Sequence, residues 1–115
     1  MENPDFLPAL SSKGKSVAIT NAAASGDLTV HTTTAGKRFV VYHVWLQAEG
    51  ATDITFKSGA TALSGPLAFA VNAERGWISS GVPIIRGNAV GDNFVIAISA
   101  AVQVNGFALV GEIEA

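Results

Sequence analysis

From residue 16 onward, the sequence consists of short runs in which apolar and polar residues alternate, separated by clusters of Gly, Asn, Asp and Ser. In residues 27–33, for example, Leu28 and Val30 alternate with polar residues. Alternation with a period of two gives a β-strand one face toward the core and one toward water, whereas an amphipathic helix repeats about every 3.6 residues. Because helical periodicity is hard to find, the pattern predicts an all-β fold, an antiparallel β-sandwich.

About eight strands are expected, and some of them are joined by long connections. The longest connections fall in residues 59–66 and 82–92. Short strands with a few longer crossovers favour a jelly-roll-like sandwich over a simple meander. The expected strands are residues 16–20, 27–33, 38–49, 53–58, 67–71, 76–80, 93–100 and 102–113.

The expected strand over residues 38–49 is apolar on both faces. Such a strand lies either under a second layer of the same chain or in an interface between subunits, and the sequence leaves both interpretations open. By strict alternation, one face carries Phe39, Val41 and Trp45, and the other carries Val40, Tyr42, Val44 and Leu46.

The last two expected strands are predicted to form a hairpin across residues 100–101. Beyond it, the apolar residues switch from even-numbered to odd-numbered positions between Val104 and Phe107, on either side of an Asn-Gly dipeptide. Asn-Gly favours a tight hairpin turn, but a Gly-containing β-bulge within one long strand changes the parity in the same way. We favour the bulge, because residues 102–104 are few for an independent hairpin arm.

The length and composition predict one domain that associates with another protein. A chain of 115 residues suits one compact domain. It is 49% hydrophobic and only 14% charged, against about a quarter charged in an average soluble domain. A chain of this size buries only about two thirds of the surface that its unfolded form exposes, so a partner is expected to cover part of the apolar excess.

Charge and cysteine content exclude several classes of function. Seven Lys and Arg against nine Asp and Glu give a net charge of -2, without the basic excess of a nucleic-acid-binding protein. Without cysteine there is no disulfide framework, thiolate metal site or thiol nucleophile. No apolar stretch approaches the roughly 20 residues of a membrane span, and the N-terminus lacks the cationic start of a secretory signal. We expect no nucleic-acid partner and no membrane partner.

Residues 1–15 are expected to form an extended N-terminal arm, and residues 16–115 a single β-sandwich domain. Pro, Ser, Gly and Lys make up much of the arm and disfavour regular structure. Phe6 and Leu7 are its apolar anchors, which favours docking on a partner. The alternative is a frayed chain end.

The residues that carry chemistry form no recognisable catalytic pattern. The only histidines, His31 and His43, point to opposite faces if residues 35–36 form a two-residue hairpin turn. No H-x-H pair with a downstream Glu indicates a cupin-like metal site. The acids fall mostly in turns and strand ends, and neither a G-x-S-x-G motif nor a phosphate loop is present. We expect no catalytic residue, no metal, no cofactor and no enzymatic activity.

Most aromatic residues occupy strand positions that the alternation assigns to the core-facing side. Trp77, near a loop, is the best candidate for a surface platform, although Trp more often lies in a core or an interface. The partner-interface candidates are therefore Phe6, Leu7, Tyr42 and Trp77.

Two segments, ITFKSGATALSGPL and DNFVIAISAAVQVNGFALVG, carry a further pattern. In this pattern the chain resembles small structural proteins of tailed-bacteriophage virions. Ile98 stands where the pattern has Leu, which keeps the apolar character. The matching elements are a strand ending TFKSG at residues 55–59, a T-x-L-S-G turn at residues 61–65 and an S-A-A-V-Q-V-x-G element at residues 99–106.

The resemblance implies a capsid decoration or cement protein, or a β domain of a head or tail fibre. We expect a homo-oligomer, a trimer, that binds the major capsid protein and stabilises the head shell. Its expected place is the capsid surface of the virion, after assembly in the cytoplasm of a host bacterium. The alternative is a receptor- or glycan-binding module of a phage tail or fibre, with its site in residues 59–66 and 82–92.

Overall fold

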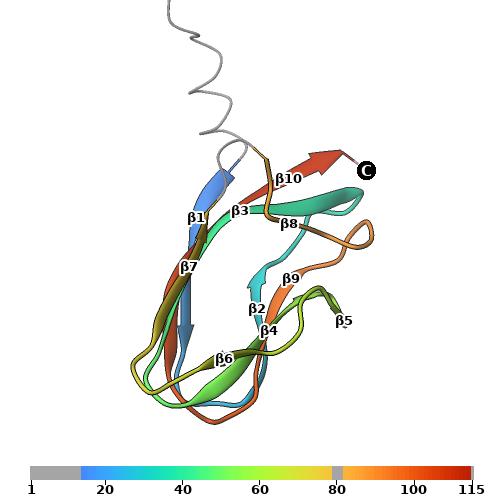
Figure 1. The fold of residues 1–115 in the computed structure, drawn as a ribbon. Coiled ribbons are helices and arrows are strands. Elements are labelled where there is room, and N and C mark those ends of the chain that lie inside the picture. The colour runs from blue at the N-terminus through green and yellow to red at the C-terminus, as the bar shows by residue number, and fades with distance from the viewer. Residues whose placement is uncertain (1–13, 79–81, 115) are drawn as a thin grey trace, which may run out of the picture.

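The computed structural model, which describes residues 14–78 and 82–114, is a sandwich of two antiparallel β-sheets (Figure 1). Sheet A contains β1 (Gly14–Asn21), β3 (Lys37–Ala48), β7 (Glu74–Ile78), β8 (Ile85–Arg86) and β10 (Val104–Glu114). Sheet B contains β2 (Gly26–His31), β4 (Thr52–Ser58), β5 (Thr61–Ala62), β6 (Leu67–Phe69) and β9 (Phe94–Ile98). The described residues include no helix of the length and apolar character needed to cross a membrane.

The strand order is that of a jelly roll. Sheet A runs β1-β10-β3-β7, with β8 also paired to β3, and sheet B runs β2-β9-β4-β5, with β6 also paired to β4. The chain alternates between the sheets from β1 to β4, so consecutive strands face each other across the core instead of pairing (Figure 1). The predicted jelly-roll-like sandwich is therefore confirmed.

All eight expected strands are present, with their ends displaced by about two residues or less in the described part. The two strands that the sequence pattern missed, β5 and β8, are each two residues long and lie within the long connections. Strand β1 begins at Gly14 instead of residue 16. Runs of two residues show no periodicity, which is why alternation cannot reveal them.

The predicted hairpin across residues 100–101 is wrong. Strand β9 lies in sheet B and β10 in sheet A, so residues 99–103 connect the two layers. Residues 34–37 do form a turn, in which the Lys37 N–H donates to the Thr34 carbonyl at 3.1 Å. It too connects strands of different sheets, β2 and β3, so the hairpin register behind the histidine argument does not occur.

Inward-facing aromatic and aliphatic side chains fill the space between the sheets. Phe39 from sheet A and Phe94 from sheet B are completely buried, with ring centroids 5.4 Å apart. The Phe56 ring lies 6.1 Å from the Phe94 ring. As the alternation in β9 predicts, Ile96 and Ile98 are buried beside Phe94. This core is drawn from both layers, so neither sheet can bury its apolar face alone.

Strand β10 is continuous through Asn105-Gly106, which forms neither a turn nor a bulge. Against β3 the register shifts instead between Leu109 and Val110. The long strand that we favoured is present, but the bulge was expected at the wrong place. The parity change in the sequence has a simpler origin, because Phe107 keeps the alternation and lies on the outer face of sheet A.

The register shift places one extra residue, Tyr42, in β3. On either side of it, Val41 and Val44 both belong to the buried core, although strict alternation puts them on opposite faces. Trp45 pairs with the outward-facing Phe107 and therefore faces outward. The expected face shared by Phe39, Val41 and Trp45 is thus wrong, because a β-bulge resets the parity of all residues beyond it.

Candidate functional site

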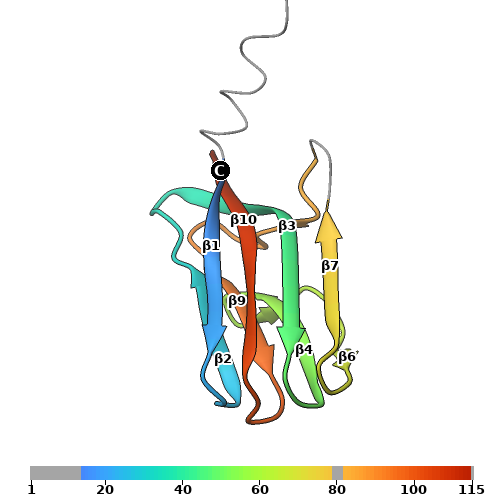
Figure 2. The ribbon, with the colours of Figure 1, turned by 90° about the vertical axis from the view of Figure 1, so that its left-hand side faces the viewer.

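The outer face of sheet A carries three rows of side chains that run across four strands, from β1 to β7. Residues paired across an antiparallel sheet point to the same face, so the register of sheet A defines each row. Figure 2 views sheet A from this side, with β1, β10, β3 and β7 next to one another. The rows are Ser16, Leu109, His43 and Ile78; Ala18, Phe107, Trp45 and Gly76; and Thr20, Asn105, Gln47 and Glu74.

Aromatic rings gather at the middle of this face. The Phe107 ring centroid lies 5.0 Å from His43, edge to face, and 6.3 Å from Trp45, stacked. Gly76 lies under the Trp45 ring, since a Cβ at this glycine would be 3.2 Å from Trp45 Cδ1. Phe107 and Ile78 remain 36% and 74% exposed. The face thus presents stacked rings and an exposed isoleucine to the outside.

Charge is scarce on the same face. Glu74 is the one carboxylate in the three rows, and they contain neither Lys nor Arg. The outer face of sheet B differs, because Lys57 there forms an ion pair with Asp27 at 3.0 Å. Within these three rows, the outer face of sheet A is therefore more apolar than the outer face of sheet B around Lys57.

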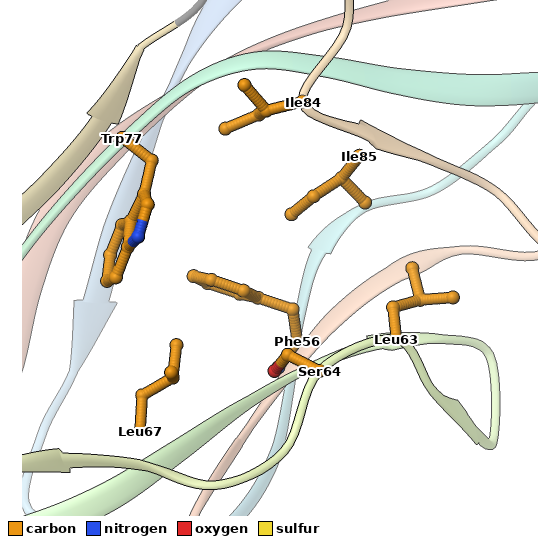
Figure 3. A pocket seen from close by; sticks show the side chains of 7 residues that line it. All are labelled: Phe56, Leu63, Ser64, Leu67, Trp77, Ile84 and Ile85. Atoms are coloured by element: carbon orange, nitrogen blue, oxygen red, sulfur yellow. The ribbon is translucent and has the colours of Figure 1, made fainter.

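A second feature is an apolar groove of about 240 Å³ between the edges of the two sheets (Figure 3). Trp77 of β7 and Phe56 of β4 contact each other edge to face in its wall, with ring centroids 5.3 Å apart and nearly perpendicular planes. The guanidinium of Arg75 lies 5.8 Å from the centroid of the Trp77 ring. The groove is lined by Phe56, Leu63, Ser64, Leu67, Trp77, Ile84 and Ile85.

The groove brings together the two long connections that the sequence analysis singled out. Leu63 and Ser64 come from residues 59–66, and Ile84 and Ile85 come from residues 82–92. Ser64 is the one polar residue in the lining. The Ser64 hydroxyl already accepts a hydrogen bond from the Phe56 N–H at 3.0 Å and donates to the Gly65 carbonyl at 2.9 Å. The walls therefore suit apolar side chains.

The structure places two of the four predicted interface residues in different surroundings. Trp77 is half-buried and lines the groove. Tyr42 is the extra residue of the β3 bulge and is also half-buried. Phe6 and Leu7 lie outside the described residues. The interface role of all four stays a prediction.

Sequence reasoning missed Trp45, Phe107, His43 and Ile78 as surface residues. Most aromatic residues were expected on the core-facing side of their strands, and the faces of residues 38–49, which include Trp45, were left open between a second layer and a subunit interface. The one available signal was the parity of Phe107 relative to Val104, which simple alternation places on opposite faces. Pairing with Phe107 then identifies Trp45 as outward, but that pairing is visible only in the folded sheet.

A polar cluster at one end of the sandwich joins the two sheets. His31 Nε2 donates to Glu112 Oε2 at 2.8 Å, and the Thr34 N–H donates to the same oxygen at 3.0 Å. The Thr34 backbone N–H lowers the pKa of Glu112 from its ordinary value of 4.5, and His31 adds to this effect against the opposing influence of burial. Nearby, hydrogen bonding and attraction to Glu114 raise the pKa of Lys37.

Ser58 is the most buried hydroxyl of sheet B, with 1% of its surface exposed. It donates to Asp92 Oδ2 at 2.8 Å and accepts from the Asn88 N–H at 2.7 Å. These bonds tie the end of β4 to the connection before β9, a structural task. In the part of the chain that the structure describes, no three His, Asp or Glu side chains gather as a metal site would require.

Comparison with known proteins gives a likeness of fold. No protein-family model matches the chain, and no curated protein matches its sequence. A structure of the disulfide-linked pili that form Bacillus endospore appendages matches with a TM-score of 0.52 and 16% identity, over 88% of this chain and 86% of that one.

Two viral proteins match less well. A virus-like particle of the extra small virus of the giant freshwater prawn Macrobrachium rosenbergii matches at a TM-score of 0.44 and 14% identity, over 85% of this chain and 76% of that chain. The coat protein of Tobacco streak virus matches at 0.41 and 15%, over 87% of this chain and 88% of that chain. At these identities, what the chain shares with the Bacillus pilus structure is its fold.

Proposed function

We propose that this protein is a non-enzymatic structural subunit of a virion. It forms homo-oligomers, most simply trimers, through the outer face of sheet A, and it decorates and stabilises the head shell by binding the major capsid protein. The observation that supports self-association is the exposed apolar face around Phe107, Trp45 and Ile78. Contiguous apolar surface with few charges is typical of protein–protein contact sites.

The size of the apolar face indicates how much it can contribute. Four strands span about 14 Å across the sheet, and three rows span about 14 Å along the strands, so the flat area is on the order of 200 Å². A standard interface buries roughly 800 Å² on each partner. The face therefore supplies the apolar centre of an interface, and surrounding surfaces or further segments have to supply the remainder.

The assembly cannot rest on disulfide bonds between copies of this chain. The Bacillus appendage structure with the similar fold is described as a disulfide-linked pilus. This chain contains no cysteine, so disulfides cannot join its copies. Several modest contacts in one oligomer can still give firm attachment, because each contact raises the effective concentration for the next.

The second candidate is a receptor- or glycan-binding module, for which the two connections that meet at the groove would form the site. Sugar sites combine an aromatic surface with several convergent polar groups. The groove has Trp77 but only Ser64 as a polar lining residue, and the Ser64 hydroxyl is occupied. A glycan array with the purified protein tests this candidate, and selective binding of one glycan class would favour it over decoration.

The test of self-association uses two matched alanine-to-lysine variants. Ala18→Lys introduces a charge into the middle row of the apolar face, whereas Ala68→Lys introduces the same charge on the outer face of sheet B, beside Asp53. Both alanines are exposed strand residues, so both variants are expected to fold. Sedimentation velocity and light scattering should show an oligomer for the wild type and Ala68→Lys, and a monomer for Ala18→Lys.

A wild type that remains monomeric at 100-micromolar levels, or equal association of all three proteins, would contradict the role of this face. The decoration step is tested separately, by cosedimentation with shells of the parent virus that lack this protein. Saturable binding of the oligomer supports the proposal. An oligomer that ignores the shells would leave self-association intact and refute decoration.

A further inference from the structure

We propose that the apolar groove binds residues 6–10 of the N-terminal segment of a neighbouring copy. This inference rests on the proposed self-association and adds a second contact to the outer face of sheet A. The occupant is thus the Phe-Leu-Pro-Ala-Leu stretch that precedes β1 in the sequence of another subunit.

The groove is too large to be a packing defect. Its volume of about 240 Å³ is many times the roughly 10–15 Å³ of such space that one water needs, so several waters fit in it. The side chains of Phe56, Ile84 and Ile85 offer those waters no hydrogen-bond partner, and Trp77 offers only its indole N–H. Replacing them with apolar side chains is therefore favourable, by about 25 cal/mol for each Å² of apolar surface removed from water.

The N-terminal segment has the composition that such a groove requires. The thirteen residues before β1 contain one concentrated apolar stretch, residues 6–10, and no equally apolar run elsewhere. Pro8 within it fixes one backbone dihedral, which lowers the entropy lost when the segment is held in an extended form. A short apolar segment with a proline is a common ligand for an aromatic-walled groove.

The charges also match. Glu2 and Asp5 precede the apolar stretch. On the groove side, Arg75 of β7 lies beside the Trp77 ring. Arg75 forms no ion pair with any other described residue. Acidic residues that approach with the apolar stretch would meet this positive edge, which favours the encounter and its orientation.

Reach favours a neighbouring copy over the same chain. Gly14 lies in one row with Gly111, Val40 and Arg86, so β1 and the groove edge are three strand spacings apart, about 14 Å. The four steps from Leu10 to Gly14 also span about 14 Å at full extension. The chain's own groove is therefore within reach only of a taut, straight linker, and this favours the groove of a neighbouring copy.

The absence of cysteine makes a clean crosslinking test possible. Two full-length single-cysteine variants, Leu7→Cys and Leu63→Cys, are mixed under mild oxidation, and the disulfide-linked dimer is followed by gel electrophoresis. Leu63 lines the groove and is half-buried, so its replacement leaves the main core intact. The matched control pairs Leu7→Cys with Thr29→Cys, an exposed position on the outer face of sheet B.

Docking predicts that the groove pair links at least about tenfold faster than the control pair, because binding raises the effective concentration of the two thiols. Equal rates, or no linked dimer, would overturn the inference. So would a double variant, Leu7→Cys with Leu63→Cys, that closes within one chain at a rate independent of dilution, since this locates the segment in its own groove.

A second variant provides a readout without cysteines. Phe6→Ser with Leu7→Ser should reduce the oligomer mass or raise its dissociation constant by at least about tenfold, as removal of buried apolar side chains predicts. Ser11→Ala with Ser12→Ala, in the same segment, should change neither. If the wild type associates but the Phe6/Leu7 variant associates equally well, this inference fails while the proposed function stands. A monomeric wild type refutes the proposed function itself.

Discussion

Gly106 lies in β10 at the centre of sheet A, between Ile19 of β1 and Leu46 of β3. A Cβ added there would be 1.8 Å from the Trp45 carbonyl oxygen and 2.9 Å from its carbonyl carbon. Both atoms belong to the backbone, so no side-chain rotation can relieve the contact. We therefore predict that Gly106→Ala forces β10 and β3 apart and destabilises the domain.

The size of the effect follows from the required movement. Real Cβ contacts are essentially never shorter than 3.0 Å, so the two backbones must separate locally by about 1.2 Å. Hydrogen bonds that span about 2.9 Å then stretch beyond any useful length. The loss of two such bonds, each with a net value of about 0.5–1.5 kcal/mol, together with imperfect packing, gives about 2–4 kcal/mol.

This is a large share of the total for a chain of this size, which at about 0.05–0.15 kcal/mol per residue is on the order of 6–17 kcal/mol. Urea unfolding followed by Trp fluorescence measures the change, with Gly65→Ala as the control. A Cβ at Gly65 meets nothing within 4 Å, so that variant should be neutral or stabilised by up to about 1 kcal/mol. Equal stability of Gly106→Ala and Gly65→Ala would refute the reasoning.

Two further predictions concern the polar clusters. Ser58→Ala should lower the unfolding free energy by about 1–3 kcal/mol, because Asn88 and Asp92 lose a buried hydrogen-bond partner. The control, Ser16→Ala at an exposed position, should change the unfolding free energy by less than about 0.5 kcal/mol. Equal effects of the two substitutions would contradict the structural role of Ser58. Glu112→Gln tests the sheet-joining cluster through pH. Because the folded pKa of Glu112 is lowered below 4.5, its stabilising effect is fully present above about pH 4.5 and is lost as the pH falls through the folded pKa. The difference in unfolding free energy between wild type and variant should therefore shrink as the pH falls below 4.5, and a difference that does not shrink at any pH below 4.5 would exclude this role.

Much of the fold was predictable from local pattern. Leu28 and Val30 in β2, and Phe94, Ile96 and Ile98 in β9, show the alternation that each strand needs to bury one face. Two long connections between short strands were enough to favour a jelly roll, and the structure confirms it. The candidate site was predicted less completely: of its residues, only Trp77 had been named as an interface candidate, although the alternative site in residues 59–66 and 82–92 included Leu63 and Ile84 of the groove.

The sequence by itself determined that the chain forms short, half-apolar strands of an all-β fold, because alternation is a property of the chain that needs no knowledge of strand partners. Only the tertiary structure decided which sheet each strand joins, and so placed β9 and β10 in different layers. It also decided, through the bulge at Tyr42, that Trp45 faces outward. The groove arises in the same way, from Leu63 and Ile84, which are distant in sequence. Strand pairing, the change of face at a bulge and the meeting of distant residues in a groove all depend on contacts between remote segments. No local pattern in the sequence encodes these contacts.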